Sequence, residues 1–391
     1  MQTSNILVVG GGIGGLTAAH ALRSAGFAVT LVEKAPAFAP VGAGIILAAN
    51  AASILEALGI APESVGKPMA GLHLQTASGA MLHAAEMDSL PQRYATSFAL
   101  HRADLHALLL AGLEDVPMHM GTTVTAVEAY PDGVSVALSD GSQATWDLVL
   151  GADGIHSRVR ALLYGTDEPA LAYSGYSCWR FVCPNPGIDA ASEVWGRGQR
   201  VGLVPLTRER LYVFLVMNAP RGTVQPRWPD ALCQAYAGFP EPVQQVLRAA
   251  QQSNAEVVHH DLFDLARHVW GNERIWLLGD AAHAVLPNLG QGAAMAIEDA
   301  FALASALCQG ADFRQAHAGY VSVRSLRVRR VWKQSRLIGS VAQWQNPVAS
   351  WFRNELVRMT PVCASRRRMT QLLEPGVALA ERAFPPDESS A

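Results

Sequence analysis

Three glycine-rich turns hold the acidic residues of this chain that are best placed to bind a ligand. They lie at Gly10–Gly15, at Asp153 and at Asp280, and each follows a short apolar segment. A carboxylate near such a turn can accept hydrogen bonds from sugar hydroxyls, and the free amides of a glycine-rich helix start can hold phosphate or partial negative charge. The five cysteines form no CxxC pair and show no metal-ligand spacing. The expected chemistry is therefore that of a nucleotide, with no metal site.

The first turn belongs to a predicted strand–helix–strand unit. Its expected parts are a strand at Asn5–Val9, a helix ending at Ser24, a strand at Ala28–Val32, and Glu33 at the end of that strand. A GxGxxG turn with an acid about twenty residues further on is the pattern of a dinucleotide site. In that pattern Gly10 permits the turn, Gly12 lets the backbone approach a pyrophosphate, and Gly15 lets helix and strand pack closely. Glu33 would accept hydrogen bonds from the adenosine ribose.

The third turn lies almost a whole chain away, in the segment IWLLGDAAHAVLPNLGQGAAMAIEDA. A strand at Ile275–Leu278 is followed by Gly279-Asp280, a loop with Pro287, and a helix that starts near Gly290. Turns this far apart in sequence can share one ligand only if that ligand is long. An adenine dinucleotide with a ribityl arm fits: Asp280 would hold the ribityl chain, and the helix start at Gly290–Gly292 the O2/N1 edge of a flavin ring.

Two further features leave alternatives open. Arg102 stands at the start of a predicted helix, where it is either a contact to phosphate or flavin or an exposed side chain. The loop PVGAGIILAANA, which begins at Pro40, contains Gly42 and Gly44. It is either a segment that moves or lies close to a ligand, or a plain surface turn.

The composition indicates a large core and no strong charge. Half of the 391 residues are hydrophobic, 16% are charged, and the formal net charge is −3. A chain of this length is expected to form two domains, or one large domain with an insertion. The slightly negative net charge shows no basic excess of the kind that nucleic-acid-binding proteins carry. No stretch reaches the ~18 apolar residues of a membrane-spanning helix. The odd number of cysteines indicates reduced thiols, so we expect a soluble, cytoplasmic protein.

A sheet of a different kind is expected in the middle of the chain. From about Tyr173, short aromatic-rich segments alternate with turn signals, which predicts antiparallel strands inserted into the nucleotide domain. These aromatic residues could wall an apolar pocket, although core packing also explains most of them: Trp179, Trp195, Tyr212 and Phe214. The expected domains are 1–170 with 256–310 for the nucleotide, 171–255 for the sheet, to which residues near 71–100 contribute, and 311–391 for C-terminal helices.

A long helical region is predicted from Phe313 to Trp344. It carries a run of six basic residues, namely Arg324, Arg327, Arg329, Arg330, Lys333 and Arg336. We interpret this run as a solvated helix face, because charge runs on helices usually face water.

The three motifs, GGGIGG with Glu33, GADGIHS and GDAAHAVLPNLGQGAAMAIEDA, resemble in order and spacing those of the single-component FAD-dependent aromatic monooxygenases of the para-hydroxybenzoate hydroxylase superfamily. The resemblance covers nearly the full chain. It implies an α/β fold with a glutathione-reductase-like Rossmann FAD domain, an inserted antiparallel substrate sheet and a helical C-terminal segment. The cofactor residues expected on this basis are Gly10, Gly12, Gly14, Gly15, Glu33, Lys34, Arg102, Val124, Asp153, Asp280, Gly290, Gln291 and Gly292.

The resemblance also implies a reaction. NADH or NADPH docks transiently and reduces the flavin, oxygen adds at flavin C4a, and the resulting hydroperoxide hydroxylates an electron-rich aromatic ring. The expected partners are a small aromatic substrate and O2, bound by a monomer or homodimer. Pro287 would lie by the reactive edge of the flavin, and the turn around Asp153 would contact FAD and NAD(P)H.

Shorter segments are similar to one branch of the superfamily, the enzymes that hydroxylate 2-alkyl-4-quinolones at C3. These segments are SCWRFVCP, EVWGRGQR, KQSRLIG and ASRRRM. The urate-hydroxylating enzymes match more loosely, and they carry Asp where this chain has Asn288, which argues against a urate-type substrate. Arg200 and Tyr212 have counterparts in the urate enzymes, so we expect both near the substrate. His73, His101 and His283 are weaker candidates.

Other functions remain open at this stage. A flavoprotein reductase of the geranylgeranyl-reductase type shares the same fold and would consume no oxygen. A hydroxylase of another small aromatic, such as a hydroxybenzoate or a purine, is a second alternative. A flavin halogenase would carry a WxWxIP segment, which the chain lacks.

Overall fold

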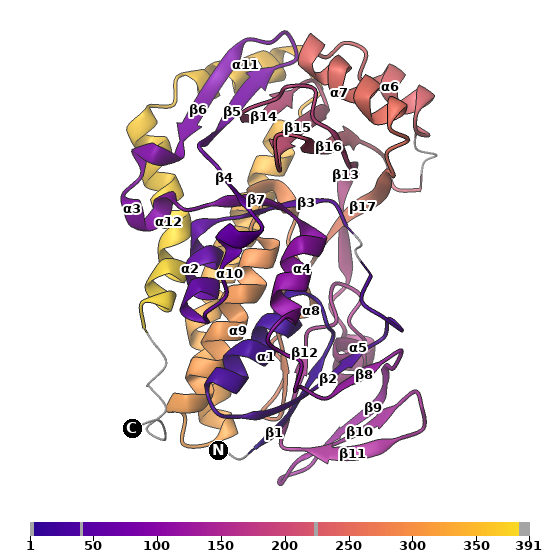
Figure 1. The fold of residues 1–391 in the computed structure, drawn as a ribbon, viewed down its shortest axis with the longest axis vertical. Helices are drawn as coiled ribbons and strands as arrows, with labels where there is room; N and C mark the ends of the chain where they lie inside the picture. The colour runs from indigo at the N-terminus through magenta and orange to yellow at the C-terminus, as the bar shows by residue number, and fades with distance from the viewer. Residues whose placement is uncertain (1–3, 40–41, 223–225, 383–391) are drawn as a thin grey trace.

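A computed structural model describes residues 4–39, 42–222 and 226–382 (Figure 1). Pro40 and Val41 of the predicted glycine loop, and residues 383–391 of the C-terminal segment, lie outside these ranges. The fold is α/β, as the sequence predicts, with a parallel sheet, a large antiparallel sheet and a C-terminal set of helices. Among the described residues no helix is both long enough and apolar enough to cross a membrane.

The parallel sheet has five strands in the order β18-β12-β1-β2-β8. Their bounds are β1 Asn5–Val9, β2 Ala28–Glu33, β8 Met118–Met120, β12 Leu148–Gly151 and β18 Ile275–Leu277. Each pair of neighbours runs in parallel. Because the carboxyl ends of parallel strands share one edge, the turns after β1, β12 and β18 lie next to one another. The predicted convergence of the three glycine turns is thus a property of the fold.

Apolar side chains bury both faces of this sheet. One face packs against helices, which are α1 Ile13–Ser24, α2 Ala49–Ala57, α4 Arg102–Leu110 and α9 Gly292–Gln309. The other face packs against the short helices α5 Arg158–Tyr164 and α8 Asp280–His283, and against an antiparallel sheet of β9 Val124–Ala129, β10 Val134–Leu138 and β11 Gln143–Trp146. Leu7 of β1 and Val149 of β12 point to this second face and are fully buried.

The antiparallel sheet has seven strands in the order β17-β13-β16-β15-β14-β5-β6. Its strands are β5 Gly71–Thr76, β6 Met81–Glu86, β13 Leu171–Pro184, β14 Ala191–Trp195, β15 Gln199–Pro205, β16 Arg210–Asn218 and β17 Val258–Leu265. The hairpin of β5 and β6 joins the rest of this sheet through a parallel pairing of β5 with β14. Helices α6 Asp230–Ala235 and α7 Glu241–Gln252 cover its outer face.

A small sheet lies between the two larger ones in Figure 1. It consists of β3 Gly44–Leu47, β4 Lys67–Pro68 and β7 Phe98–His101, in the order β3-β7-β4. These strands were not predicted, because each is short and the pairing joins segments far apart in sequence. Their position brings β3 against the seven-stranded sheet, where Gly44 packs on Tyr212 of β16.

Three helices complete the described chain: α10 Phe313–Ala342, α11 Pro347–Arg358 and α12 Val362–Ala380. The sequence analysis predicts no helix with the bounds of α12, which contains Pro375. The helix nonetheless continues and lies on α2. Gly376 allows the close approach, because a Cβ there would come within 2.7 Å of Asn50 Cβ and of Glu298 Oε1.

Candidate active site

A cavity of about 230 Å³ lies at the carboxyl edge of the parallel sheet. It brings together residues from the ends of β1 and β2 and from the turn after β12, including the predicted Gly10, Gly12, Glu33, Lys34 and Asp153. Thr122 and Thr123 also line it, directly before the predicted and fully buried Val124. The predicted residues of the first two turns therefore share one cavity, in the place where ligands bind to such sheets, whereas Asp280 and Gly290–Gly292 are not among its lining residues.

The glycines of the first turn have distinct roles. Gly10 has φ +108°, a conformation that favours glycine, and a Cβ at Gly15 would stand 1.9 Å from the Gly10 carbonyl oxygen. A Cβ at Gly14 would come within 2.8 Å of Leu278 Cδ1, so Gly14 lets α1 pack against the turn after β18. Gly12, by contrast, faces open space. A phosphate can therefore approach the backbone there.

The acids at the first two turns are already bound by backbone amides. Glu33 Oε2 accepts from the Gly11 amide at 2.6 Å, and Oε1 accepts from the Ala35 amide at 2.8 Å. Each carboxylate oxygen has a second lone pair, so Glu33 can still accept from a ribose hydroxyl. Asp153 accepts from Ser157 Oγ at 2.5 Å and from the Arg158 amide at 2.6 Å, which fixes the start of α5. Its side chain thus shapes the turn.

Asp280 begins α8 directly after β18, and its side chain is exposed at the carboxyl edge of the sheet. Crowding by the surrounding protein raises the pKa of the Asp280 carboxyl, and the nearby charges of His283 and Arg102 oppose that effect. Arg102 is exposed at the start of α4, and no hydrogen bond or ion pair holds its guanidinium within the described residues. The sequence predicts for Arg102 either a contact to phosphate or flavin or an exposed side chain. In the structure its positive charge is near enough to Asp280 to oppose the rise in the pKa of that carboxyl.

The loop after α8 presents backbone groups at the same edge. Pro287 and Gly290 are exposed, and Gly290 has φ +62°. Gly292 is the first residue of α9, and a Cβ there would meet nothing within 4 Å. The start of this eighteen-residue helix is thus open, and its unpaired amides can hold partial negative charge.

A buried ionic network that the sequence analysis missed holds this helix start. Glu298 and Asp299 are fully buried on α9, and Arg324 from α10 binds both of them, at 2.5 and 2.6 Å. Arg327 binds Glu298 and the side chain of Gln291. The adjacent acids within the apolar helix sequence AAMAIEDAFALA were the available signal, since buried charges require partners.

The same network corrects the interpretation of the basic run as a solvated face. Arg324 and Arg327 are 1% and 7% exposed, because their guanidiniums neutralise the two buried acids of α9. Arg329, Arg330 and Lys333 are exposed, in agreement with the prediction.

His283 also belongs to this network. Its Nε2 lies 2.5 Å from Asp299 Oδ2, which in turn accepts from the Gly279 amide at 2.8 Å. His283, a weaker candidate for a place near the substrate, thus makes a buried structural hydrogen bond. The other two weak candidates also make structural contacts: His101 caps α4 by accepting from the Ala103 amide, and His73 faces Glu86 on the β5–β6 hairpin.

The inner face of the seven-stranded sheet carries an aromatic pair. The rings of Tyr212 and Phe214 lie 5.9 Å apart, and two glycines make room for them. A Cβ at Gly44 would come within 2.3 Å of Tyr212, and a Cβ at Gly202 within 1.9 Å of Phe214. Burial raises the pKa of the Tyr212 hydroxyl, and its oxygen has no hydrogen-bond partner among the described residues. At neutral pH the hydroxyl therefore keeps its proton.

Arg200 lies on the same sheet but is fully engaged. Its guanidinium donates to Gln343 Oε1 at 3.0 Å, to Glu193 Oε1 at 3.2 Å and to Asn288 Oδ1 at 2.8 Å. The Asn288 amide nitrogen donates to Tyr176 Oη at 2.8 Å and to the Ser335 carbonyl at 2.9 Å. Arg200 thus ties the substrate sheet and α10 to the loop that contains Pro287.

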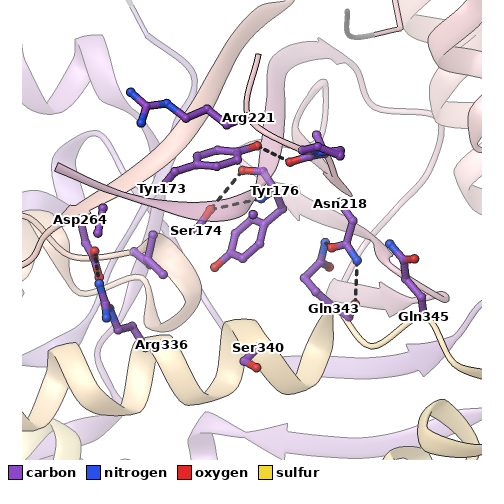
Figure 2. A pocket seen from close by; sticks show the side chains of 15 residues that line it. Tyr173, Ser174, Tyr176, Asn218, Arg221, Asp264, Arg336, Ser340, Gln343 and Gln345 are labelled. Atoms are coloured by element: carbon purple, nitrogen blue, oxygen red, sulfur yellow. Dashed lines mark hydrogen bonds and ion pairs between the residues drawn. The ribbon is translucent and has the colours of Figure 1, made fainter. Parts of the chain in front are cut away.

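A larger cavity, of about 740 Å³, adjoins this network (Figure 2). Tyr176 and Leu286 line it, and Figure 2 shows Tyr176 pointing toward α10. On one side Arg336 holds the buried Asp264 through two hydrogen bonds of 2.6 and 2.7 Å. Gln343 and Gln345 form part of the opposite wall.

These residues fit FAD. The open glycine turn suits a pyrophosphate, Glu33 a ribose, Asp280 a hydroxylated chain, and the open start of α9 the electron-rich edge of a flavin ring. A Cβ at Gly12 or Gly292 would project into free space, which is what a backbone that contacts a ligand closely requires.

Comparisons with known proteins agree with this assignment. The FAD binding domain family matches residues 3–335. The 2-heptyl-3-hydroxy-4(1H)-quinolone synthase of Pseudomonas aeruginosa is 38% identical over 380 residues, covering 95% of this chain and 98% of that protein. The aurachin C monooxygenase/isomerase of Stigmatella aurantiaca is also 38% identical, covering 90% of this chain and 94% of that protein.

A solved structure extends the comparison to the fold. Klebsiella pneumoniae HpxO, solved with FAD and uric acid, has a TM-score of 0.87 and 27% identity to this chain. The match covers 95% of this chain and 97% of that one. The chain therefore belongs to the FAD binding domain family and is an FAD-dependent monooxygenase of aromatic compounds.

Proposed function

We propose that this enzyme hydroxylates a 2-alkyl-4-quinolone at C3, with NADH or NADPH as the electron donor. The observation that carries the proposal is the 38% identity, over nearly the whole of both chains, to the Pseudomonas quinolone synthase. Relatives named for 3-amino-4-hydroxybenzoate, urate and 6-hydroxynicotinate match less closely and over less of the chain.

The cofactor is held by residues from three strand ends and one helix start. We assign the pyrophosphate to the Gly10–Gly15 turn, the ribose to Glu33 and Lys34, the ribityl chain to Asp280, and the flavin edge to Gly290–Gly292. Arg102 adds positive charge beside Asp280. Reduced FAD supplies the activation of O2 that the reaction needs.

The protein's work on the substrate is to orient the ring and exclude water. A 4-quinolone is a vinylogous amide and is nucleophilic at C3, so it needs little help from a base. Tyr212 and Phe214 offer an aromatic wall of two tilted rings, and the Tyr212 hydroxyl can donate to a polar atom of the substrate ring. An apolar wall with one free hydroxyl donor suits such a substrate.

Arg200 is assigned a positioning role, because every polar contact of its guanidinium goes to the protein. It holds Asn288, which follows Pro287 at the exposed edge of the loop. The network fixes this loop relative to the aromatic wall, and hence the substrate relative to the cofactor. The nicotinamide donor binds transiently, in keeping with the single GxGxxG motif of the sequence.

The test is a substrate screen with the FAD-loaded enzyme. Oxygen uptake, NADH or NADPH oxidation and hydroxylated product are measured with 2-heptyl-4-quinolone, urate, 6-hydroxynicotinate and 3-amino-4-hydroxybenzoate. We expect the quinolone to give one 3-hydroxylated product per reduced nicotinamide. Peroxide as the sole product with the quinolone, beside coupled turnover of another compound, would reject the substrate. Reduction of substrate without oxygen uptake would instead favour a reductase.

A further inference from the structure

Helix α11 presents an apolar stripe to solvent. Six large apolar side chains of α11, its C-cap and the first residue of α12 are more than half exposed. The exposed fractions are 74% for Val348, 63% for Trp351, 58% for Phe352, 60% for Leu356, 78% for Met359 and 57% for Val362. The spacing of these positions in α11 places them along one side of the helix. Large apolar side chains gathered on one exposed face indicate a contact surface.

The helix is anchored so that this face points outward. On its inner side Arg353 is buried and donates to the carbonyl oxygens of Ala342 and Gly196, at 2.7 and 3.1 Å. Its guanidinium also lies over the Trp195 ring. Ser350 is buried too and donates to the Trp344 carbonyl. Arg353 and Ser350 thus fix the inner side of α11 to the protein, and the apolar stripe lies on the other side.

Positive charge borders the stripe. Residues 346–368 contain five arginines and one glutamate, a net charge of +4, whereas the whole chain carries −3 and the remainder therefore −7. Arg366, Arg367 and Arg368 are exposed on the first turns of α12. A negatively charged surface would attract this segment and repel the rest of the molecule.

We propose that α11 and the first turns of α12 dock the enzyme on the surface of an anionic lipid bilayer. Trp, Phe and Leu on one side of a helix, with arginines beside them, are the composition of helices that lie in the membrane interface. The apolar side chains enter the headgroup region, and Arg366–Arg368 contact anionic headgroups. Figure 1 shows α11 at one pole of the molecule, where a flat surface can reach it.

A second copy of the chain fits this surface less well. In a two-fold symmetric contact both copies use the same patch, so the interface would gather two clusters of arginines with no acidic cluster to neutralise them. The surface also begins next to the larger cavity. Gln345 lines that cavity, and Asn346 is the N-cap of α11. Docking would therefore bring the cavity close to the bilayer.

The test measures binding of the FAD-loaded enzyme to vesicles. Vesicles of phosphatidylcholine with phosphatidylglycerol are compared with vesicles of phosphatidylcholine alone, by co-sedimentation in the absence of substrate. We expect binding to the anionic vesicles that weakens as salt is added. Trp351→Ser/Leu356→Ser should weaken it at least ~30-fold, and Arg366→Gln/Arg367→Gln/Arg368→Gln by roughly 100-fold. The control Leu326→Ser/Leu337→Ser changes side chains on α10 that are 56% and 65% exposed, and it should bind like the wild type.

Other outcomes overturn the proposal. One is that the wild type does not bind anionic vesicles, and another is that Trp351→Ser/Leu356→Ser binds as well as the wild type. A dimer in light scattering that the same variant dissociates, without vesicle binding, would assign the surface to a second copy. Because no turnover is measured, the result does not depend on the proposed substrate. FAD absorbance and thermal unfolding confirm that each variant is folded.

Discussion

The side-chain oxygen of Asn288 accepts a 2.8 Å hydrogen bond from the guanidinium of Arg200. Eighty-eight residues separate the two in sequence. The bond joins the seven-stranded sheet to the loop beside Pro287, and the Asn288 amide nitrogen extends the link to Tyr176 and to the Ser335 carbonyl. We regard this cluster as the element that sets the distance between the substrate wall and the cofactor site.

The variant Asn288→Asp tests this role. It keeps an acceptor for Arg200 but replaces a donated hydrogen bond with repulsion between the new carboxylate and the Ser335 carbonyl. We expect the yield of product per reduced nicotinamide to fall roughly fivefold, while FAD affinity stays within about twofold. Asn254→Asp, on an exposed residue, serves as the matched control. If a folded Asn288→Asp enzyme gave the same yield of product per reduced nicotinamide, this cluster would not position the substrate.

Asp280→Ala tests the ribityl assignment. Loss of a charge-assisted hydrogen bond should weaken FAD binding about 10- to 100-fold. Titration of the apoenzyme with FAD, followed by flavin fluorescence, measures the effect. Asp264→Asn is the comparison, because Asp264 binds Arg336 and is not among the predicted cofactor residues. If both variants bound FAD equally well, Asp280 would not hold the cofactor.

Gly202→Ala tests the aromatic wall through a double-mutant cycle. The new methyl group would stand 1.9 Å from Phe214 Cζ, so the ring must move. We expect a loss of about 1–3 kcal/mol in unfolding free energy, together with a higher KM for the aromatic substrate. In a Phe214→Ala background the contact is gone, and Gly202→Ala should then cost little. Equal penalties in both backgrounds, measured by urea denaturation, would contradict the packing described.

We expect His268 to make the free energy of unfolding depend on pH. Burial, together with the positive charges of His283, Arg336 and Arg329, lowers the pKa of His268 from 6.5 to about 4. Between these values the unfolded chain binds more protons, so the contribution of His268 is present above pH 6.5 and is lost as the pH falls toward 4. The loss amounts to up to about 3 kcal/mol. His268→Phe should flatten the curve of unfolding free energy in this window, and an unchanged slope would exclude His268 as its source.

The parts of the fold that were predictable are those whose signal is local. The unit from Asn5 to Glu33 carries its glycines, apolar strands and terminal acid within one short segment. Its turn and Asp153 line one cavity, and the strand order places the turn at Asp280 at the same sheet edge. Strands β5 and β6 lie within the region near 71–100 that was expected to contribute to the antiparallel sheet.

What the sequence could not show depends on distant partners. Arg324 and Arg329 look alike in a helical pattern, yet only Arg324 has buried acids opposite it. Likewise, nothing near Arg200 indicates that its guanidinium is shared among Glu193, Asn288 and Gln343. Helix α12 was missed because Pro375 disfavours a helix locally, whereas its packing on α2 stabilises it.

The most direct test of the central claim is turnover of 2-heptyl-4-quinolone by the FAD-loaded enzyme under isotopically labelled dioxygen. The product is identified by mass spectrometry and by the position of its new hydroxyl group. We predict one labelled oxygen atom at C3 and one product for each NADH or NADPH oxidised. Oxidation of the nicotinamide that yields only labelled peroxide, or a product with unlabelled oxygen, would contradict quinolone hydroxylation by this enzyme.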